Sequence, residues 1–540
     1  MRQRPEGFLR GALVLTVTGL IVKLMGALYA PAIVRIFALY DAHGGNVGKA
    51  LVGIPAATYL IIVSFSSSGF NIAISRLVAA RVARGDQGSA LRAFRWSLQF
   101  MLVVGLLGAV GLYMVAPWLA ARHYAPAAVT GYRALAPAVF IVAIVSALRG
   151  LFSGLQEQTP TGVSQIFEQG LRIVTGIALV ALLARSAITS GAAGANFAAV
   201  AGAAAAAVYL AWLYRQRTAG TETPPPLSAQ SPVRLLGELV SLALPIAVIG
   251  ALIPFILEAD NATVLPQLKA SGLMEVPALD FLGRLQNAMT VIGLPLLVST
   301  GLYVAVVPAI TAAITAGAVE RARAQVATAY KLTLVVALPS TVGLYLLATP
   351  VYAILMGTTH GGEVLQALAL AVPFLMLQQT SAGILQGAGH EWLTARNLLI
   401  GVAIKVGLNF WWAALPVGGD PVAAVRGAAY ATAAGLAVAT LLNLWDVQRK
   451  LHAGFDTTAL LLRPALATLA MGVVVALAFP PASRVLRATP AALLCMGAGT
   501  LVFSAVLLRL GGLSAADLEQ VPRVGRRAAL LLRRLRLLKG

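Results

Sequence analysis

The chain carries the stretch GANFAAVAG at residues 194–202 and returns to it 233 positions later as GAAYATAAG, residues 427–435. Three further segments recur at an offset of 232 or 233: SGFNIAI at 68–74 as TGLYVAV at 300–306, VGLY at 110–113 as VGLY at 342–345, and Gly150-x-x-x-Gly154 as Gly383-x-x-x-Gly387. Any single match is weak, because small residues four apart are a general feature of packed helices. The constant offset indicates an internal duplication.

The amino-acid composition indicates whether these repeats lie in water or in a membrane. The chain has 540 residues, of which 59% are hydrophobic and 11% charged, against about 25% charged in an average soluble domain. The mean hydropathy of +0.85 predicts a polytopic membrane protein. The net charge of +21 comes from basic residues in short loops, so we expect no nucleic-acid partner.

Apolar stretches of about 20 residues predict an all-α polytopic membrane protein with about 14 transmembrane helices. The predicted helices are 10–37, 49–80, 92–118, 130–155, 160–185, 191–214, 234–258, 281–310, 325–349, 364–388, 393–416, 422–447, 457–479 and 490–510. Each repeat holds six of them, an even number, so both copies enter the membrane from the same side. We therefore expect two parallel six-helix repeats that form two lobes around a central cavity, followed by helices 13 and 14.

The duplication also predicts the domain boundaries. These are an N-terminal lobe at 1–217, a Pro-rich cytoplasmic linker at 218–232, a C-terminal lobe at 233–450, helices 13 and 14 at 451–512, and a basic amphipathic cytoplasmic tail at 513–540. With both termini cytoplasmic, 26 Lys and Arg lie on the cytoplasmic side against nine on the other, as the positive-inside rule requires.

The sequence lacks the motifs that several classes of activity require. We find no Walker A motif, no GxGxxG opening a helix after a strand and no HExxH. A single cysteine, Cys495, can form neither an intrachain disulfide nor a paired CxxC metal site. We therefore expect no cofactor, no metal and no enzymatic activity, and a repeat-built bundle favours an alternating-access transporter driven by a gradient, the membrane potential or the substrate.

A long motif in predicted helices 4 and 5 then points to a family. RGLFSGLQ at 149–156, TPT at 159–161, SQ at 164–165, EQ at 168–169 and Arg172 resemble the stage V sporulation protein B-like branch of the lipid II flippases, within the multidrug/oligosaccharidyl-lipid/polysaccharide exporter superfamily. The resemblance extends over residues 11–84. It implies a flippase that moves an undecaprenyl-linked sugar, such as the peptidoglycan precursor lipid II, to the outer leaflet of a bacterial plasma membrane. Tyr29 and Ala30 stand where the family usually has an arginine.

Four basic residues within the predicted spans are candidates for the substrate cavity: Lys23, Arg35, Arg172 and Lys405. A charge at the centre of a span costs roughly 2.5–3.5 kcal/mol on insertion scales, so it usually faces a cavity or a partner. Lys23 either contacts the substrate or is a packed structural lysine, and Arg35 can instead reach the membrane interface. Lys405 is the repeat mate of Arg172, but position 401 is Gly, so no acid precedes Lys405 by four residues.

Four other residues are candidates for gating or for coupling-ion binding: Arg149, Glu168, Glu258 and Asp260. Glu168 and Arg172 are four apart on one helical face, which predicts an intrahelical ion pair. Glu258 and Asp260 end predicted helix 7, either as an exposed outer terminus or as a coupling-ion or gating site. Arg149 is either a cytoplasmic-gate residue or a structural residue of helix 4.

Three functions fit the predicted architecture to different degrees. A lipid-linked oligosaccharide flippase needs a basic cavity for the diphosphate, and a cation-coupled multidrug exporter on the same fold needs an acidic one. The excess of basic residues in the spans favours the flippase. A glycosyltransferase or ligase would need a motif such as DxD, which is absent. We expect a lipid-linked oligosaccharide as substrate, an anionic leaflet as partner of the tail, and a monomer.

Overall fold

The computed structural model describes residues 8–41, 43–218, 231–414, 419–452 and 458–512, and every element in these ranges is a helix. The predicted linker, apart from its ends, and the predicted basic tail lie outside the described residues. The described residues divide into two compact units, one through Gln286 and the other from Asn287 onward. This boundary lies within one helix, whereas the repeat boundary expected at 218–232 stays a prediction.

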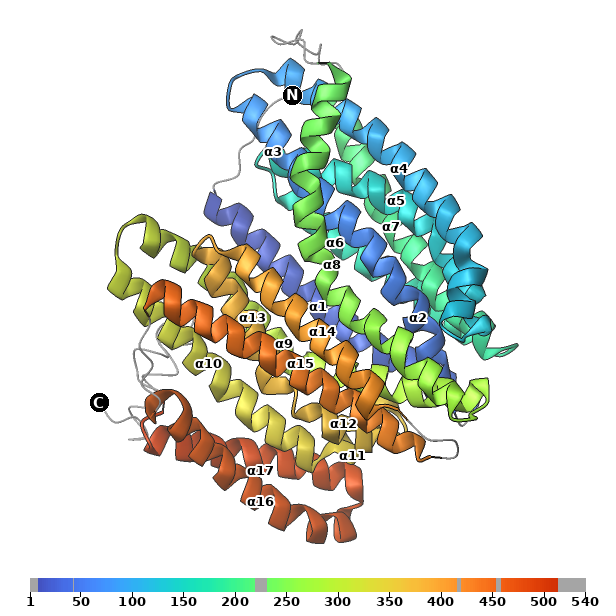
Figure 1. Cartoon of the computed structure of the whole chain (residues 1–540), viewed down its shortest axis with the longest axis vertical. Coiled ribbons are helices and arrows are strands. Elements are labelled where there is room, and N and C mark those ends of the chain that lie inside the picture. Colours follow the sequence, from blue (N-terminus) through green and yellow to red (C-terminus); the bar gives the residue numbers. More distant parts are fainter. Residues whose placement is uncertain (1–7, 42, 219–230, 415–418, 453–457, 513–540) are drawn as a thin grey trace. The chain divides into compact units, whose positions relative to one another are not determined.

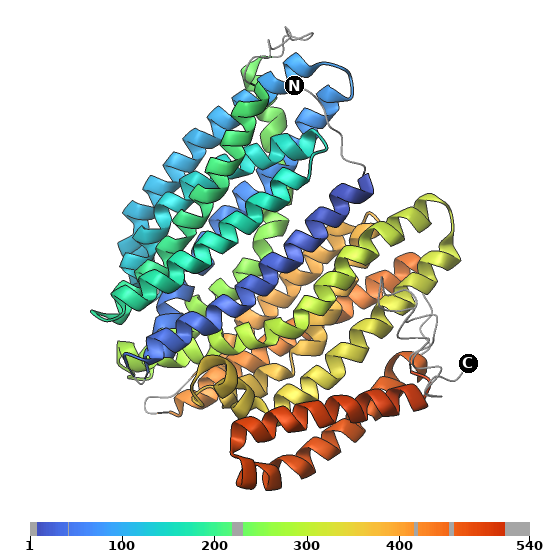
Figure 2. The ribbon, with the colours of Figure 1, turned by 180° about the vertical axis from the view of Figure 1, so that it is seen from behind.

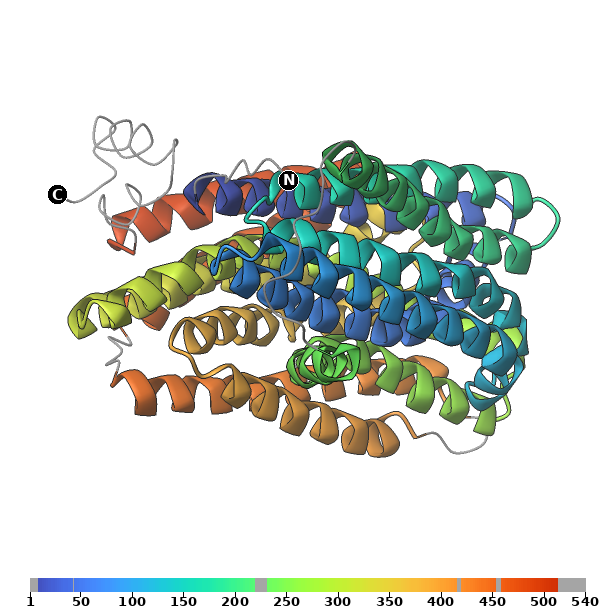
Figure 3. The ribbon, with the colours of Figure 1, turned by 90° about the horizontal axis from the view of Figure 1, so that it is seen from above.

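The first unit (Figure 1) contains eight α-helices and the start of a ninth. They are α1 (Phe8–Ala38), α2 (Gly44–Ser64), the π-helix η1 (Phe65–Phe70), α3 (Asn71–Val82), α4 (Gln87–Arg122), the 3₁₀ turn η2 (Pro126–Ala128), α5 (Val129–Gly154), α6 (Thr159–Leu183), α7 (Ile188–Thr218), α8 (Pro232–Ala270) and α9 (Glu275–Thr315) as far as Gln286. Helix α6 packs on both α1 and α7, and α8 packs on α2 and η1. Figure 3 shows α6 and α7, in blue-green, alongside each other.

The second unit continues α9 and holds the remaining helices. They are α10 (Val319–Leu346), α11 (Ala348–Met356), α12 (Gly362–Ala369), α13 (Val372–Gly387), α14 (Glu391–Trp412), α15 (Pro421–Leu451), the π-helix η3 (Thr458–Leu462), α16 (Arg463–Leu486) and α17 (Ala488–Arg509). The last two form a hairpin, red in Figure 2, in which α16 packs on α10.

The predicted fold class is confirmed. Twelve helices in the described residues are long and apolar enough to cross a membrane, or 13 if α12 and α13, bent by 48°, form one span. Helix α8, which covers the predicted seventh span, is a further helix of 39 residues. Each of the 14 predicted spans therefore coincides with a helix or with a helix broken at a bend.

The helix of the second span begins five residues earlier than predicted. The predicted span starts at residue 49, whereas α2 begins at Gly44, so Lys49 lies within the helix. The glycines in the first turns of α2 make room for α1. A Cβ at Gly48 would lie 2.5 Å from the Phe37 ring, and one at Gly44 would lie 2.5 Å from the Phe37 backbone oxygen.

The duplication recurs in the packing of each unit. A Cβ at Gly202 on α7 would lie 2.4 Å from the backbone oxygen of Glu168 on α6. In the second unit, a Cβ at Gly435 on α15 would lie 2.5 Å from the backbone oxygen of Gly401 on α14. These contacts lie 233 positions apart in both partners. Glycine is needed at both crossings because the helix backbones approach more closely than any side chain allows.

Candidate functional site

Helices α1 and α6 bring polar groups of the first unit together. No Cβ fits at Gly176 on α6, because it would lie 2.1 Å from the hydroxyl oxygen of Tyr29 on α1. Tyr29 therefore lies directly against α6 at Gly176, which is one turn after Arg172. The hydroxyl of Tyr29 and the Nε of Arg172 are buried, and neither has a hydrogen-bond partner among the described residues.

Arg172 is also close to α2. Its charge acts on Lys49, Tyr29 and Tyr59, which places a lysine and two tyrosines within electrostatic range of the guanidinium. Lys49 is half-buried and forms no ion pair with any described residue. Two cations close together in a span repel each other unless an anion lies between them. Lys49 was not among the residues predicted for the substrate cavity, although the predicted second helix begins at that residue.

The predicted ion pair between Glu168 and Arg172 is wrong. Glu168 instead pairs with Arg149 on α5, with 2.7 Å between the Arg149 Nη2 and a carboxylate oxygen of Glu168. The Nε of the same arginine donates to the hydroxyl of Ser164, at 2.9 Å. Ser164 and Glu168 lie one turn apart on α6, so the planar guanidinium spans both acceptors. Arg149 thus joins α5 to α6 and leaves Arg172 without this acid.

The other predicted cavity residues lie in different settings. Lys23 and Arg35 are exposed on α1 of the first unit. Lys405 on α14 is buried in the second unit, with 2% of its surface exposed. A Cβ at Gly435 would lie 2.9 Å from the Lys405 Cβ, and one at Gly202 would lie 3.0 Å from the Arg172 Cβ. Arg172 and Lys405 therefore occupy equivalent positions beside a glycine in their own units.

Glu258 on α8 belongs to a partly buried polar cluster. Its Oε1 lies 2.8 Å from Nε2 of His123, the residue that ends α4, and Thr58 on α2 donates to its carboxylate at 3.3 Å. The hydroxyl of Tyr132 on α5 lies 3.0 Å from Nδ1 of the same histidine. Asp260 is buried two residues farther along α8, with 3% of its surface exposed. The expected exposed helix terminus is therefore wrong for both acids.

A second acidic group in the first unit escaped the sequence analysis. Asp280, at the start of α9, accepts from Asn46 on α2 at 3.0 Å and from the guanidinium of Arg284 at 2.6 Å. All three residues are buried, and Arg284 also lies over the ring of Phe281, 4.3 Å from its centroid. The spacing of Asp280 and Arg284, four residues apart in an apolar stretch, was a readable signal of a helical ion pair.

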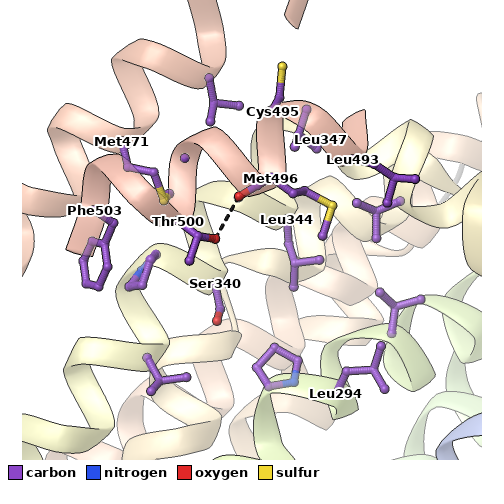
Figure 4. A pocket seen from close by; sticks show the side chains of 18 of the residues that line it. Leu294, Ser340, Leu344, Leu347, Met471, Leu493, Cys495, Met496, Thr500 and Phe503 are labelled. Atoms are coloured by element: carbon purple, nitrogen blue, oxygen red, sulfur yellow. Dashed lines mark hydrogen bonds between the residues drawn. The ribbon is translucent and has the colours of Figure 1, made fainter. Parts of the chain in front are cut away.

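The second unit contains an apolar cavity of about 610 Å³. Figure 4 shows Leu294, Ser340, Leu344, Met471, Leu493 and Phe503 around it, contributed by α9, α10, α16 and α17. The hydroxyl of Thr500 donates to the backbone oxygen of Met496 at 2.8 Å, which satisfies its polar hydrogen within its own helix. The cavity therefore presents hydrocarbon surface to whatever enters it.

Comparisons with known proteins agree with this architecture. A family model described as polysaccharide biosynthesis protein matches residues 8–314, and a model described as MatE matches residues 279–411. Stage V sporulation protein B of Bacillus subtilis (strain 168) is 28% identical over 456 residues, covering 83% of this chain and 84% of that protein. Lipid II flippase MurJ of the same strain is 26% identical over 480 residues, covering 85% of each.

A solved structure is similar over most of its length. That structure, of the lipid II flippase MurJ in an inward closed conformation, superposes with a TM-score of 0.68 at 14% identity, covering 92% of this chain and 98% of that one. At this identity the likeness concerns the fold alone. The resemblance expected from residues 149–172 is confirmed by these matches. Because the first family model covers more than half of the sequence, the chain belongs to the polysaccharide biosynthesis protein family.

Proposed function

We propose that this protein is a flippase that moves a lipid-linked oligosaccharide, bearing an anionic diphosphate, from the inner to the outer leaflet of a bacterial plasma membrane. Relatives over more than four fifths of the chain include a lipid II flippase and stage V sporulation protein B. In this proposal both termini are cytoplasmic, in keeping with the distribution of Lys and Arg.

One observation carries the proposal. Arg172 lies in a membrane-spanning helix, its Nε is buried without a hydrogen-bond partner among the described residues, and the nearest acid on its helix is held by Arg149. Leaving such a donor buried and unsatisfied costs about 1–3 kcal/mol, more for a charged group. A diphosphate supplies several acceptor oxygens and the opposite charge. Arg172, with Lys49 and the hydroxyl of Tyr29, is therefore suited to the head group, and we assign Lys23, Arg35 and Lys405 as further contacts.

The apolar cavity supports the lipid part of the proposal. A polyprenyl chain is hydrocarbon throughout, and the cavity lining of leucine, valine, methionine and phenylalanine offers it a matched surface. The cavity is lined by residues of the second unit, and we assign it to the polyprenyl chain of the substrate.

A cation-coupled multidrug exporter is the second candidate, because the MatE model matches residues 279–411. Such a transporter needs an available acid for a cationic substrate. Three of the acids described above lie within ion-pair distance of a basic side chain: Glu168 of Arg149, Glu258 of His123, and Asp280 of Arg284. The flippase is therefore the better supported of the two.

The deciding experiment uses the full chain in proteoliposomes. The substrate is a fluorescent undecaprenyl diphosphate-linked sugar, and a membrane-impermeant quencher reports its arrival in the outer leaflet. We expect flipping by the wild type, retention of part of the activity by Arg172→Lys, and loss by Arg172→Leu at equal incorporation. Uptake of a monovalent cationic dye, with no flipping of the anionic lipid, would establish the exporter instead.

A further inference from the structure

The four side chains around Glu258 form a closed ring of hydrogen-bond contacts. His123 Nε2 lies 2.8 Å from a Glu258 carboxylate oxygen, and His123 Nδ1 lies 3.0 Å from the Tyr132 hydroxyl. The Tyr132 hydroxyl lies 3.3 Å from the Thr58 hydroxyl, which lies 3.3 Å from both carboxylate oxygens of Glu258. The members come from α2, the end of α4, α5 and α8, so the ring joins four helices of the first unit.

The ring has fewer hydrogens than hydrogen-bond contacts, so it can accept one more proton. It has four contacts, and a hydrogen bond at every one of them would need one hydrogen between the two heavy atoms. With an ionised carboxylate and a neutral imidazole, the members supply three hydrogens: one each from the imidazole, the phenol and the threonine. One contact would then bring two lone pairs together, which is unfavourable at a buried site.

One additional proton satisfies every contact, and it can lie in two places. With an imidazolium, the imidazole donates to both Glu258 and Tyr132, Tyr132 donates to Thr58, and Thr58 donates to the carboxylate. With a protonated carboxyl, three of the hydrogen bonds reverse: Glu258 donates to Thr58, Thr58 to Tyr132, and Tyr132 to His123, while His123 still donates to Glu258. The two arrangements contain the same atoms and the same number of protons, and they differ only in which of the two residues carries the additional proton.

The charged groups near the ring interact with other residues, so the additional proton would be held by the ring itself. The His123 side chain is 3% exposed and that of Glu258 is 17% exposed, so the carboxylate is the more accessible of the two groups. The other charged groups near the ring are engaged elsewhere: Arg122 lies over the Trp118 ring, Arg133 lies over the Tyr113 ring, and Glu275 accepts from the backbone of Ala127. Asp260 is buried on the same helix, and Lys49 lies more than two turns earlier on α2.

We propose that the ring of Thr58, His123, Tyr132 and Glu258 is a proton-binding site that holds α8 against α2, α4 and α5. The bound proton completes the ring, and its release to water leaves one repulsive contact that weakens the attachment of α8. The position of α8 in the first unit thereby depends on one proton. This inference is independent of the transported substrate, and its test needs none.

The test follows the protons and the helix together, with the full chain in lipid nanodiscs. Nitrogen-15 labelling of the five histidines, with His123→Gln to assign the resonance, reports an imidazolium. Infrared difference spectra against Glu258→Gln report a protonated carboxyl. Spin labels at Met114→Cys on α4 and Phe255→Cys on α8, in a Cys495→Ser background, report the distance between the helices; both sites are exposed, at 73% and 49%.

We expect about one proton per chain on the His123–Glu258 pair when the labels are close, and its release on raising the pH together with a longer distance. Glu258→Gln and His123→Gln should remove the pH dependence of the distance. Thr58→Val removes the hydroxyl without changing the charge, so it should reduce proton retention while the protein still folds. Glu275→Gln, outside the ring, should keep the wild-type transition.

Two results would overturn the proposal. The first is a neutral imidazole beside an ionised carboxylate while the labels are close. The second is an unchanged pH transition of the distance in Glu258→Gln.

Discussion

The guanidinium of Arg149 on α5 holds the carboxylate of Glu168 on α6, with 2.7 Å between Nη2 and the nearer carboxylate oxygen. This contact decides the electrostatics of α6, because it neutralises the acid that was expected to neutralise Arg172. In the second unit the equivalent of Glu168 is Gly401, so no acid lies one turn before Lys405. Each unit therefore has a basic residue beside its close crossing of two helices, at Gly202 in the first unit and at Gly435 in the second.

The first prediction tests this ion pair. Arg149→Met and Glu168→Gln should each lower the midpoint of thermal unfolding in detergent, because each leaves a charge without its partner. The free energy of unfolding should fall by about 1.5–3 kcal/mol, as for the loss of a hydrogen bond to a charged group. The lower value is expected because Glu168 is 30% exposed. The double variant should lose less than the sum of the singles. A matched cycle on Glu168 and Arg172 should be additive, and strong coupling there would restore the pair predicted from sequence.

The second prediction tests the close helix crossings. Gly202→Ala and Gly435→Ala should each destabilise the protein by about 1–3 kcal/mol, since the added methyl group overlaps a backbone oxygen. Gly111→Ala is the matched control, because nothing lies within 4 Å of a Cβ at that position on α4. Alanine is the better helix former by about 1 kcal/mol, so the control should be neutral or stabilised. Equal thermal midpoints for all three variants would contradict the tight crossing.

A third prediction concerns the exposed lysine of α1. Lys23→Ala should abolish complementation of a flippase-deficient strain while the protein still inserts and accumulates, because its ammonium is assigned to the substrate diphosphate. The comparison is Arg484→Ala, an equally exposed basic residue at the end of α16, which should complement normally. Normal growth with Lys23→Ala would assign this lysine to packing.

A fourth prediction concerns the apolar cavity. Ser340→Phe should fill part of the cavity and reduce flipping of the polyprenyl-linked substrate several-fold, with an unchanged or higher thermal midpoint. Leu477→Phe introduces the same side chain at a position on α16 that is 72% exposed, and it should leave transport intact. Full activity of Ser340→Phe at normal incorporation would show that the lipid chain does not use this cavity.

The fifth prediction concerns the basic tail, which lies outside the described residues. Its Lys and Arg should each add roughly 1 kcal/mol of attraction to an anionic leaflet, but the transmembrane helices already anchor the protein. Truncation after Gly512 should therefore leave insertion and transport largely intact, and complementation at matched expression is the measurement. Loss of transport at normal abundance would assign the tail to gating or to partner binding.

The sequence by itself determined the architecture. Apolar length, the distribution of basic residues and a constant offset of 232 or 233 positions depend only on the order of residues along the chain, and they were sufficient to predict the helices and the duplication. The motif from Arg149 to Arg172 indicated the family. These signals are local or periodic, so they can be read before any helix meets another.

The tertiary structure decided the partners of the charged groups. Sequence spacing favoured Glu168 with Arg172, but Arg149 reaches Glu168 from a neighbouring helix, and no spacing rule reports that approach. The ring around Glu258 joins residues from positions 58 to 258, and the glycines before Lys49 lie close against Phe37 of another helix. Buried polar groups bind whatever donor or acceptor packing brings within about 3 Å, and that choice is made between helices, where the order of residues along the chain gives no distance.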